Sequence, residues 1–282
     1  MQTFLNSRKR GKVPSIGDGM TKARVIVLRV EGTNCDEETV IAFEEAGASV
    51  DLVHLNELKR GKKSLEDYQI LCIPGGFTYG DDIAAGKIFA VHLKYALWNE
   101  LRKFVDESKL VLGICNGFQV LVKMGLLPNV DGSMEQQATL AFNDCGHFVD
   151  RWVYLKHENR GSCPFTRGIK GLTFVPVQHA EGKFVASEKI LDKMEENDQI
   201  VFRYVNSKGE YAGYPWNPNG SMRNVAGICN PEGNVFGLMP HPEKYIHKYT
   251  HPCWTRLPNL PEEGDGLTIF KNAVEYAEKR LK

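Results

Sequence analysis

The stretch from Lys109 to Met124 limits the possible folds more than any other part of this chain. Lys109–Gly113 is a lysine followed by an unbroken apolar run, which is typical of a strand buried on both faces of a parallel sheet. Asn116–Met124 then changes to helical spacing, so that its apolar residues share one face. The pattern predicts a buried strand that passes through a very short turn directly into a helix.

Cys115 occupies this turn, between Gly113 and Gly117. A strand, a tight turn and a helix with a reactive residue at the turn make up the nucleophile elbow of many hydrolases, which often carry serine there. Glycine neighbours suit the turn because they lack the Cβ atom that would clash in strained backbone. The helix N-terminus behind the thiol favours the thiolate, which is the form that attacks. The alternative is an inert cysteine, because cysteines at strand ends are usually small core residues.

A second short strand, Val235–Met239, is followed by Pro-His-Pro-Glu. The two prolines favour an extended backbone, in which side chains two residues apart point the same way. His241 and Glu243 can therefore cooperate, with the carboxylate orienting the imidazole while the imidazole serves Cys115. The alternative is a surface turn with an incidental histidine and glutamate, and the elbow at Cys115 argues against it.

Predicted strands and helices alternate through the first half of the chain. This order indicates βαβ units and a parallel sheet, whose binding sites lie beyond the carboxyl ends of its strands. Past Gly125, further strands and a hairpin add antiparallel pairing, so the expected fold class is α/β with an open, mostly parallel sheet and extra antiparallel strands. The expected strands are Arg24–Val30, Ser49–Leu55, Asp67–Ile73, Trp152–Lys156, Leu172–Val177, Gln199–Asn206 and Ala226–Cys229, and the expected helices are Asp36–Ala46, Ile88–Glu107, Ser187–Glu196 and Leu267–Leu281.

A glycine-rich loop, Pro74–Gly86, follows the third predicted strand. Gly75 and Gly76 allow backbone N–H groups to point into a cavity, as an oxyanion hole requires. A flexible connection is the alternative interpretation. Glycine loops also bind phosphates, but the Gly-Lys-Ser/Thr of a Walker A loop is missing here. A second loop, Tyr211–Gly220, contains prolines, glycines and aromatic residues and is expected at the surface.

The composition excludes several classes of protein. The 282 residues include 35 basic and 35 acidic side chains, so the formal net charge is zero and no nucleic acid is expected as a partner. Seven cysteines, an odd number, favour a reducing compartment over a disulfide framework. The apolar runs are too short for a membrane span and no signal peptide is evident, so we expect a cytoplasmic protein with no membrane partner.

Residues 1–21 lack a periodic apolar pattern and are expected to form a flexible extension, whereas residues 22–282 form one folded domain. His247, His251 and Cys253 have loosely metal-like spacing. No fourth ligand is obvious beside them, so no metal site is predicted.

In combination, these motifs resemble the class I, triad-type glutamine amidotransferases, which have a flavodoxin-like sheet with helices on both faces. The finer similarity is to the family of glutaminase subunits that serve phosphoribosylformylglycinamidine synthases of purine biosynthesis. It extends over about Lys22 to Glu243 and is carried by Pro74–Gly86, by Val175–Gly182, and by Asn217–Ser221 together with Ala226–Glu243.

The resemblance implies an enzyme that hydrolyses L-glutamine to glutamate and ammonia through a cysteinyl thioester. Cys115 would be the nucleophile, His241 the general base and then acid, and Glu243 the carboxylate that orients it. The backbone N–H groups of Gly76 and Asn116 would bind the oxyanion. Substrate-binding residues would be Gln119, Gly75, Phe77 and His179.

The resemblance also implies partners. The ammonia would pass to a separate large synthetase subunit, with a small accessory subunit in the same enzyme. ATP and magnesium are expected on the synthetase subunit, and no cofactor is expected in this chain, which has no recognisable nucleotide motif.

Two positions depart from the family pattern, since Ala180 stands where glycine is expected and Lys244 where arginine is common. Neither departure touches the triad. Three alternatives stay open: the glutaminase of another amidotransferase, a cysteine hydrolase of the same fold that is not an amidotransferase, and a non-catalytic interaction module.

Overall fold

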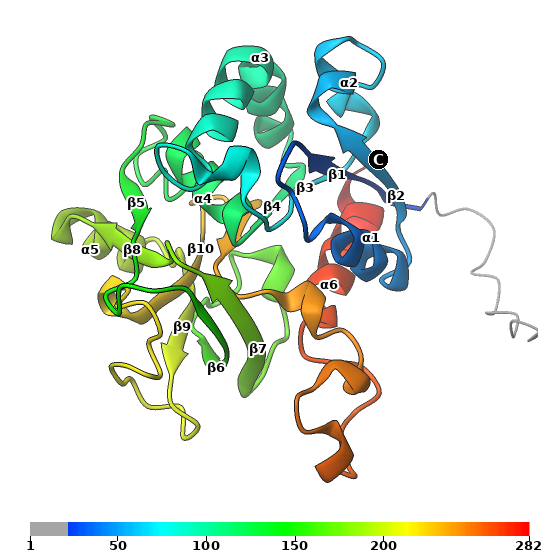
Figure 1. The fold of residues 1–282 in the computed structure, drawn as a ribbon. Coiled ribbons are helices and arrows are strands. Elements are labelled where there is room, and N and C mark those ends of the chain that lie inside the picture. Colours follow the sequence, from blue (N-terminus) through cyan, green and yellow to red (C-terminus); the bar gives the residue numbers. More distant parts are fainter. Residues whose placement is uncertain (1–21, 282) are drawn as a thin grey trace, which may run out of the picture.

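The computed structural model describes residues 22–281 and shows a large mixed sheet with helices packed against it (Figure 1). The extension expected at residues 1–21 lies outside the described residues. The strands are β1 Arg24–Arg29, β2 Ser49–His54, β3 Ile70–Ile73, β4 Leu110–Ile114, β5 Ala138–Ala141, β6 Val149–His157, β7 Leu172–His179, β8 Lys183–Ala186, β9 Ile200–Val205, β10 Val225–Cys229 and β11 Val235–Leu238. The α-helices are α1 Asp36–Glu45, α2 Leu55–Lys59, α3 Lys87–Asp106, α4 Asn116–Met124, α5 Glu188–Glu196 and α6 Leu267–Arg280.

The main sheet has the strand order β2-β1-β3-β4-β11-β10-β9-β6-β7. From β2 to β11 neighbouring strands are parallel, and from β11 to β7 they are antiparallel. The expected α/β fold, with a parallel sheet and added antiparallel strands, is confirmed. The parallel part places the carboxyl ends of β1, β3, β4 and β11 at one edge, where a site is expected.

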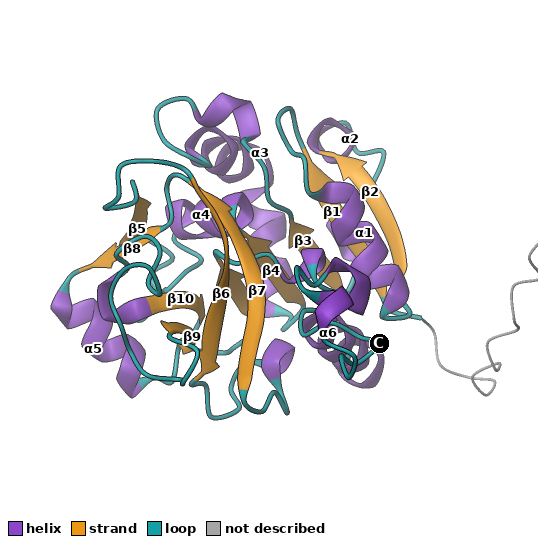
Figure 2. Cartoon of the chain, turned by 60° about the horizontal axis from the view of Figure 1, so that its bottom comes forward, coloured by secondary structure: helices purple, strands orange, loops and turns teal. Residues whose placement is uncertain are grey.

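Helices lie on both faces of the parallel part (Figures 1 and 2). On one face α1 packs against α6, and the rings of Phe43 and Phe270 meet edge to face with centroids 4.9 Å apart. On the other face α3 packs against α4. This division follows from the right-handed crossovers, because β1 to β2 and β3 to β4 step in opposite directions across the sheet.

Some elements were not expected from the sequence pattern. The four-residue strands β5 and β8 form a separate antiparallel pair beside α4. Strands this short carry too little alternation to be read from the sequence. Helix α2 was also missed, because its N-cap is His54, whose Nδ1 accepts from the Asn56 N–H at 3.1 Å, rather than a usual capping residue.

The loop Tyr211–Gly220 was expected at the surface, and this is wrong for its second half. Tyr211 and Trp216 are exposed, but Asn217 and Asn219 are buried. The Asn217 carboxamide is bonded to backbone groups of the loop itself, with its Nδ2 donating to Ser221 O at 3.0 Å. Asparagine side chains that replace missing backbone partners allow a turn to be buried.

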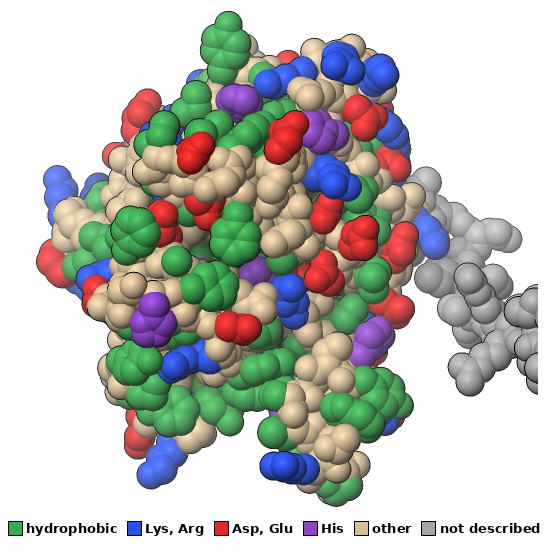
Figure 3. Space-filling model, in the orientation of Figure 1, with side chains coloured by type: hydrophobic (Ala, Val, Ile, Leu, Met, Phe, Trp, Pro, Cys, Tyr) green, Lys and Arg blue, Asp and Glu red, His purple; other side chains and the backbone are tan. Residues whose placement is uncertain are grey.

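The charged side chains on one face and the helix lengths can be compared with the sequence predictions. Basic and acidic side chains are interspersed on the face shown in Figure 3, as the balanced charge predicts. None of the helices in residues 22–281 is both long and apolar enough to span a bilayer.

Candidate active site

Cys115 lies at the turn between β4 and α4, as the elbow pattern predicts. Its backbone has φ 51° and ψ −105°, a strained conformation for a residue with a side chain. A Cβ atom at Gly117 would lie 1.8 Å from the Ile73 carbonyl oxygen, and one at Gly113 would lie 2.7 Å from the Gly117 oxygen. Both glycines are therefore required by close packing at the turn.

Strand β11 ends next to β4 and so places His241, three residues further on, near Cys115. It pairs in parallel with β4, so that Leu238 lies opposite Ile114, and the Cys115 N–H donates to the Leu238 oxygen at 2.8 Å. The His241 N–H donates to the Pro176 oxygen at 2.8 Å, which fixes the backbone of the histidine. Two segments more than a hundred residues apart in the sequence thus meet at adjacent strand ends.

His241 and Glu243 form a buried pair. The distance between His241 Nδ1 and Glu243 Oε1 is 2.6 Å, and the two side chains are 2% and 0% exposed. Burial lowers the pKa of His241, but the charges of Glu243 and Cys115 outweigh it and hold that pKa well above its usual value. The site therefore favours an imidazolium ring beside a carboxylate and a cysteine sulfur.

Cys115 and His241 border a cavity of about 270 Å³, and Glu243 lies behind the His241 ring. Cys115, His241 and Gly76 contribute to its wall, together with Cys35, Phe77, Gln178 and Lys244. The Cys115 sulfur lies 3.5 Å from the Gln178 carbonyl oxygen. A cavity of this size admits a small molecule, and its wall combines a nucleophile, a base and backbone groups.

Two backbone N–H groups can act as oxyanion donors. Gly76 pairs with Thr33 in an isolated bridge that leaves its own N–H unused, and Asn116 is the first residue of α4. Within residues 22–281, neither N–H donates to another group of the protein. A free N–H in the first turn of a helix and a second one on a glycine are suitable donors for a developing negative charge.

The side chains of Asn116 and Gln119 bond to neighbouring loops. Thr78 Oγ1 donates to Asn116 Oδ1 at 2.6 Å, and Asn116 Nδ2 donates to Asp81 Oδ1 at 3.1 Å. Gln119 Nε2 donates to the Glu181 carbonyl oxygen at 2.5 Å. These bonds tie the glycine-rich loop and the segment Gln178–Gly182, hereafter the rim segment, to α4. Direct substrate contact by Gln119 stays a prediction.

His179 is held inside the protein and is not part of the cavity wall. Its ring is bonded on both sides, with Nδ1 and Asn143 Oδ1 3.1 Å apart and Nε2 and Asn219 Nδ2 3.5 Å apart. Burial, and then the charge of His241, lowers the pKa of His179 to about 3. The observed contacts support a positioning role, and substrate contact by His179 stays a prediction.

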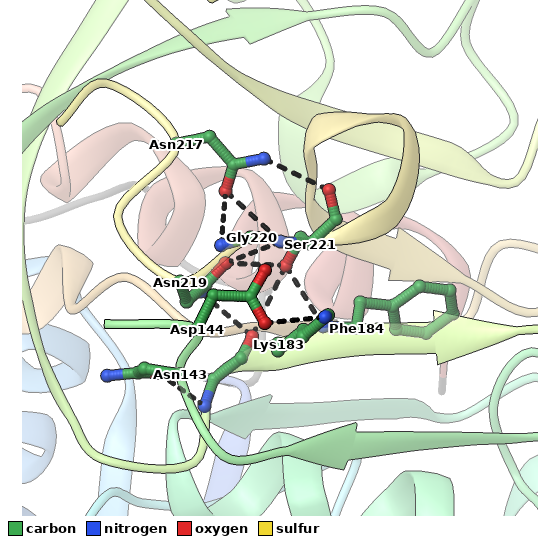
Figure 4. A network of polar contacts seen from close by, with 9 residues as sticks. Asn143, Asp144, Lys183, Phe184, Asn217, Asn219, Gly220 and Ser221 are labelled. Atoms are coloured by element: carbon green, nitrogen blue, oxygen red, sulfur yellow. Dashed lines mark hydrogen bonds and ion pairs between the residues drawn. The ribbon is translucent and has the colours of Figure 1, made fainter. Parts of the chain in front are cut away.

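A network of hydrogen bonds that includes Asn143, Asn219 and Ser221 holds the end of the rim segment in place (Figure 4). Asn219 Nδ2 donates to the Gly182 carbonyl oxygen at 2.9 Å, and the Gly182 N–H donates to Asn143 Oδ1 at 3.1 Å. The Phe184 N–H donates to Ser221 Oγ at 3.0 Å. The sequence singled out Asn217–Ser221, but it gave no signal for Asn143, whose partners lie far along the chain.

The sequence also missed Cys35. Its thiol is buried and borders the cavity. Its position at the end of the loop that follows β1 is the signal that could have found it, because parallel strands bring their following loops to one edge. His247, His251 and Cys253 do not form a metal-type group within residues 22–281; His251 Nδ1 instead accepts from the Cys253 N–H at 3.0 Å.

Comparison with known proteins identifies the family. The family model of the CobB/CobQ-like glutamine amidotransferase domain matches residues 22–277, so the chain belongs to this class of amidotransferases. A relative from Methanococcus maripaludis is 44% identical over 269 residues, covering 91% of this chain and 98% of the relative. One from Archaeoglobus fulgidus is 44% identical over 271 residues, covering 91% and 97%. Both are named phosphoribosylformylglycinamidine synthase subunit PurQ, and within its class the chain is a member of this PurQ family.

Solved structures agree with this placement. A chain in the structure of PurLQS from Thermotoga maritima superposes with a TM-score of 0.70 at 31% identity, covering 91% of this chain and 99% of that one. The glutaminase domain of a CTPS from Trypanosoma brucei has a TM-score of 0.52 at 12% identity, covering 92% and 95%, and this likeness concerns the fold alone.

Proposed function

We propose that this chain is the glutaminase subunit of a phosphoribosylformylglycinamidine synthase, hydrolysing L-glutamine and supplying ammonia for de novo purine biosynthesis. The observation that carries the proposal is that Cys115 and His241 border one small cavity, that Glu243 is bonded to the His241 ring, and that within residues 22–281 the backbone N–H groups of Gly76 and Asn116 are free. Its relatives bear the name of this synthase subunit, and a PurLQS structure has the same fold.

The first chemical step forms a thioester. The Cys115 thiolate attacks the side-chain carboxamide carbon of glutamine, and negative charge develops on the carboxamide oxygen. The N–H groups of Gly76 and Asn116 stabilise this charge, and each such donor contributes about 3 kcal/mol in comparable sites. His241, held as an imidazolium by Glu243, then gives its proton to the departing nitrogen, which leaves as ammonia.

The second step releases glutamate. His241, now neutral, takes a proton from water, and the resulting hydroxide attacks the thioester carbon. The same two N–H groups stabilise the second oxyanion. Collapse of this intermediate breaks the carbon–sulfur bond and returns the thiolate, so that glutamine and water become glutamate and ammonia. Glu243 keeps the ring oriented through both steps from 2.6 Å away.

The ammonia requires a consumer. A large synthetase subunit, with a small accessory subunit, would use it in an ATP-dependent reaction, and ATP and magnesium would bind to that partner. This chain needs no cofactor for the two steps above. We place the assembled enzyme in the cytoplasm, where free thiols persist, in agreement with the seven free cysteines.

The glycine-rich loop is the part most suited to respond to the partner. Tyr79, Asp81 and Ile83 all have positive φ, and such backbone strain is common in segments that switch. Ile83 is 88% exposed, so a partner that covers it would bury an apolar side chain of this loop. The chain alone would then hydrolyse glutamine slowly, and docking of the synthetase would raise the rate.

A diazo-ketone analogue of glutamine tests the glutaminase assignment. Incubated with the assembled enzyme, it should alkylate Cys115, and excess glutamine should protect the thiol. Peptide mass spectrometry identifies the modified residue, with Cys72 and Cys229 as internal controls because both are fully buried in strands. Equal labelling of several cysteines, or no protection by glutamine, would contradict the proposal.

A further inference from the structure

A second thiol lies beside the proposed catalytic pair. Cys35 is the N-cap residue of α1, and its buried side chain borders the same cavity as His241. One ligand atom from each of Cys35, His241 and Glu243 lies within 4.8 Å of the others. The glutaminase steps use no chemistry from Cys35. A thiol, an imidazole and a carboxylate at this spacing are the donor types that bind zinc.

Two atoms of this cluster are buried without a partner. Within the described residues, His241 Nε2 and Glu243 Oε2 make no hydrogen bond, and these two residues are 1% and 3% exposed. A buried polar atom left in this way costs about 1–3 kcal/mol. Glu243 Oε2 carries a free lone pair that a cation would satisfy, whereas the lone pair of His241 Nε2 points away from Glu243, whose Oε1 is bonded to Nδ1 at 2.6 Å.

The backbone leaves space for the thiol and the ring to face each other. A Cβ atom at Gly75 would lie 2.7 Å from His241 Cε1 and 3.3 Å from Cys35 Sγ. The ammonium of Lys244, paired with Glu38 at 3.3 Å, borders the same cavity. Its charge opposes a bound cation, whereas the Glu243 carboxylate and the sulfur of Cys35, once its proton is released, attract one.

We propose that Cys35, His241 and Glu243 form a site for zinc or a similar divalent cation, and that the bound cation switches the glutaminase off. Tetrahedral zinc with bonds of about 2.0–2.3 Å holds its donors roughly 3.5 Å apart, so three ligand atoms within 4.8 Å of one another can reach one ion after small side-chain shifts. Binding releases the thiol proton and the imidazolium proton, and the fourth position is left for water. The imidazole lone pair is then occupied, so His241 can no longer transfer protons. The metal site stands without the proposed function, and only the inhibition rests on it.

Metal binding is measured on the full chain with zinc chloride against a chromophoric chelator, and with cobalt chloride by absorption. Wild-type protein should bind one equivalent and show a thiolate-to-cobalt charge-transfer band. Cys35→Ser should lose the band and bind zinc about tenfold more weakly or worse, since even indirect partners of a metal contribute about that factor. Cys253→Ser, which removes an exposed cysteine beside His251, is the matched control and should bind like wild type.

Two further variants keep the test decisive. Glu243→Gln should also weaken zinc binding about tenfold or more, which covers the case in which Cys35→Ser does not fold. Cys115→Ala should keep the cobalt band, because the nucleophile is not a ligand. A wild-type protein without the band, unchanged binding in Cys35→Ser, or loss of the band in Cys115→Ala would each overturn the site.

Inhibition is measured separately, on glutamine hydrolysis by the assembled enzyme, with each variant normalised to its own rate without zinc. Zinc should inhibit the wild-type enzyme, and half-inhibition of Cys35→Ser should need about tenfold more zinc. Metal binding without inhibition would overturn the switch. An enzyme with no glutaminase activity at all would contradict the proposed function, while the binding measurements would still decide the metal site.

Discussion

At the scale of single residues, His241 transfers protons in this site, and Glu243 keeps its ring charged and oriented. His241 lies between the nucleophile and Glu243, and the carboxylate is the largest of the charges that raise its pKa. Glu243 itself is buried, and within residues 22–281 the only hydrogen bond of its side chain is to the His241 ring, so its contribution to catalysis passes through His241. The two residues should therefore respond differently to substitution.

We expect His241→Ala to reduce glutamine turnover by about 10²–10⁴-fold, because proton transfer is lost in both steps. Glu243→Gln should cost less, because an amide oxygen can still accept from Nδ1. It should also shift the histidine limb of the pH–rate profile to lower pH, since the charge that raises the pKa of His241 is gone. Steady-state rates across pH measure both effects. Equal losses in folded variants would show that the carboxylate has a larger role.

Residue identities predicted from the sequence depended on local pattern. Cys115 was found because its elbow lies within the continuous stretch Lys109–Met124, and Glu243 because it is two residues from His241 in extended backbone. Cys35 was not found, because its approach to His241 depends on the order of the strands, which a local pattern does not contain. The same holds for Asn143, whose contact with His179 spans a separation of 36 residues.

At the scale of elements, the turn between β4 and α4 is fixed by glycine packing. Gly117→Ala should destabilise the protein, although alanine is favoured over glycine in helices by about 1 kcal/mol. The added Cβ would lie 1.8 Å from the Ile73 oxygen, and overpacking of this kind costs about 1–3 kcal/mol or more.

Chemical denaturation measures this difference. Gly213→Ala is the matched control, because no atom lies within 4 Å of the Cβ it would add. Gly117→Ala should lower the free energy of unfolding while Gly213→Ala leaves it nearly unchanged. If both variants were as stable as the wild type, the tight contact between α4 and β3 would not be a feature of the folded protein.

The rim segment should make stability depend on acid. His179 has a folded pKa of about 3, against roughly 6.5 in an unfolded chain. Between these values the unfolded state binds a proton that the folded state does not, so stability falls as pH falls through this window. His179 alone contributes up to about 1.4 kcal/mol per pH unit. In His179→Gln the free energy of unfolding should fall less steeply with acid, and an unchanged slope would contradict the buried, neutral ring.

At the scale of the whole molecule, the alternation of strands and helices predicted the parallel part of the sheet and its active edge. The pattern could not give the strand order, in which β11, far from β4 in the sequence, lies beside β4 in the sheet. It also missed the β5–β8 pair, whose strands are too short to show periodicity. The strand order and the pairing of short strands depend on contacts between distant segments, so they cannot be predicted from local periodicity.

The central claim is that this chain contributes ammonia and nothing else to the synthase. The measurement is synthesis of phosphoribosylformylglycinamidine by the assembled enzyme carrying Cys115→Ala, with either glutamine or an ammonium salt as the nitrogen source. The account predicts that glutamine-dependent synthesis is abolished, because no thioester can form, while ammonium-dependent synthesis is largely retained. Loss of both activities in a complex that remains folded and assembled would contradict it.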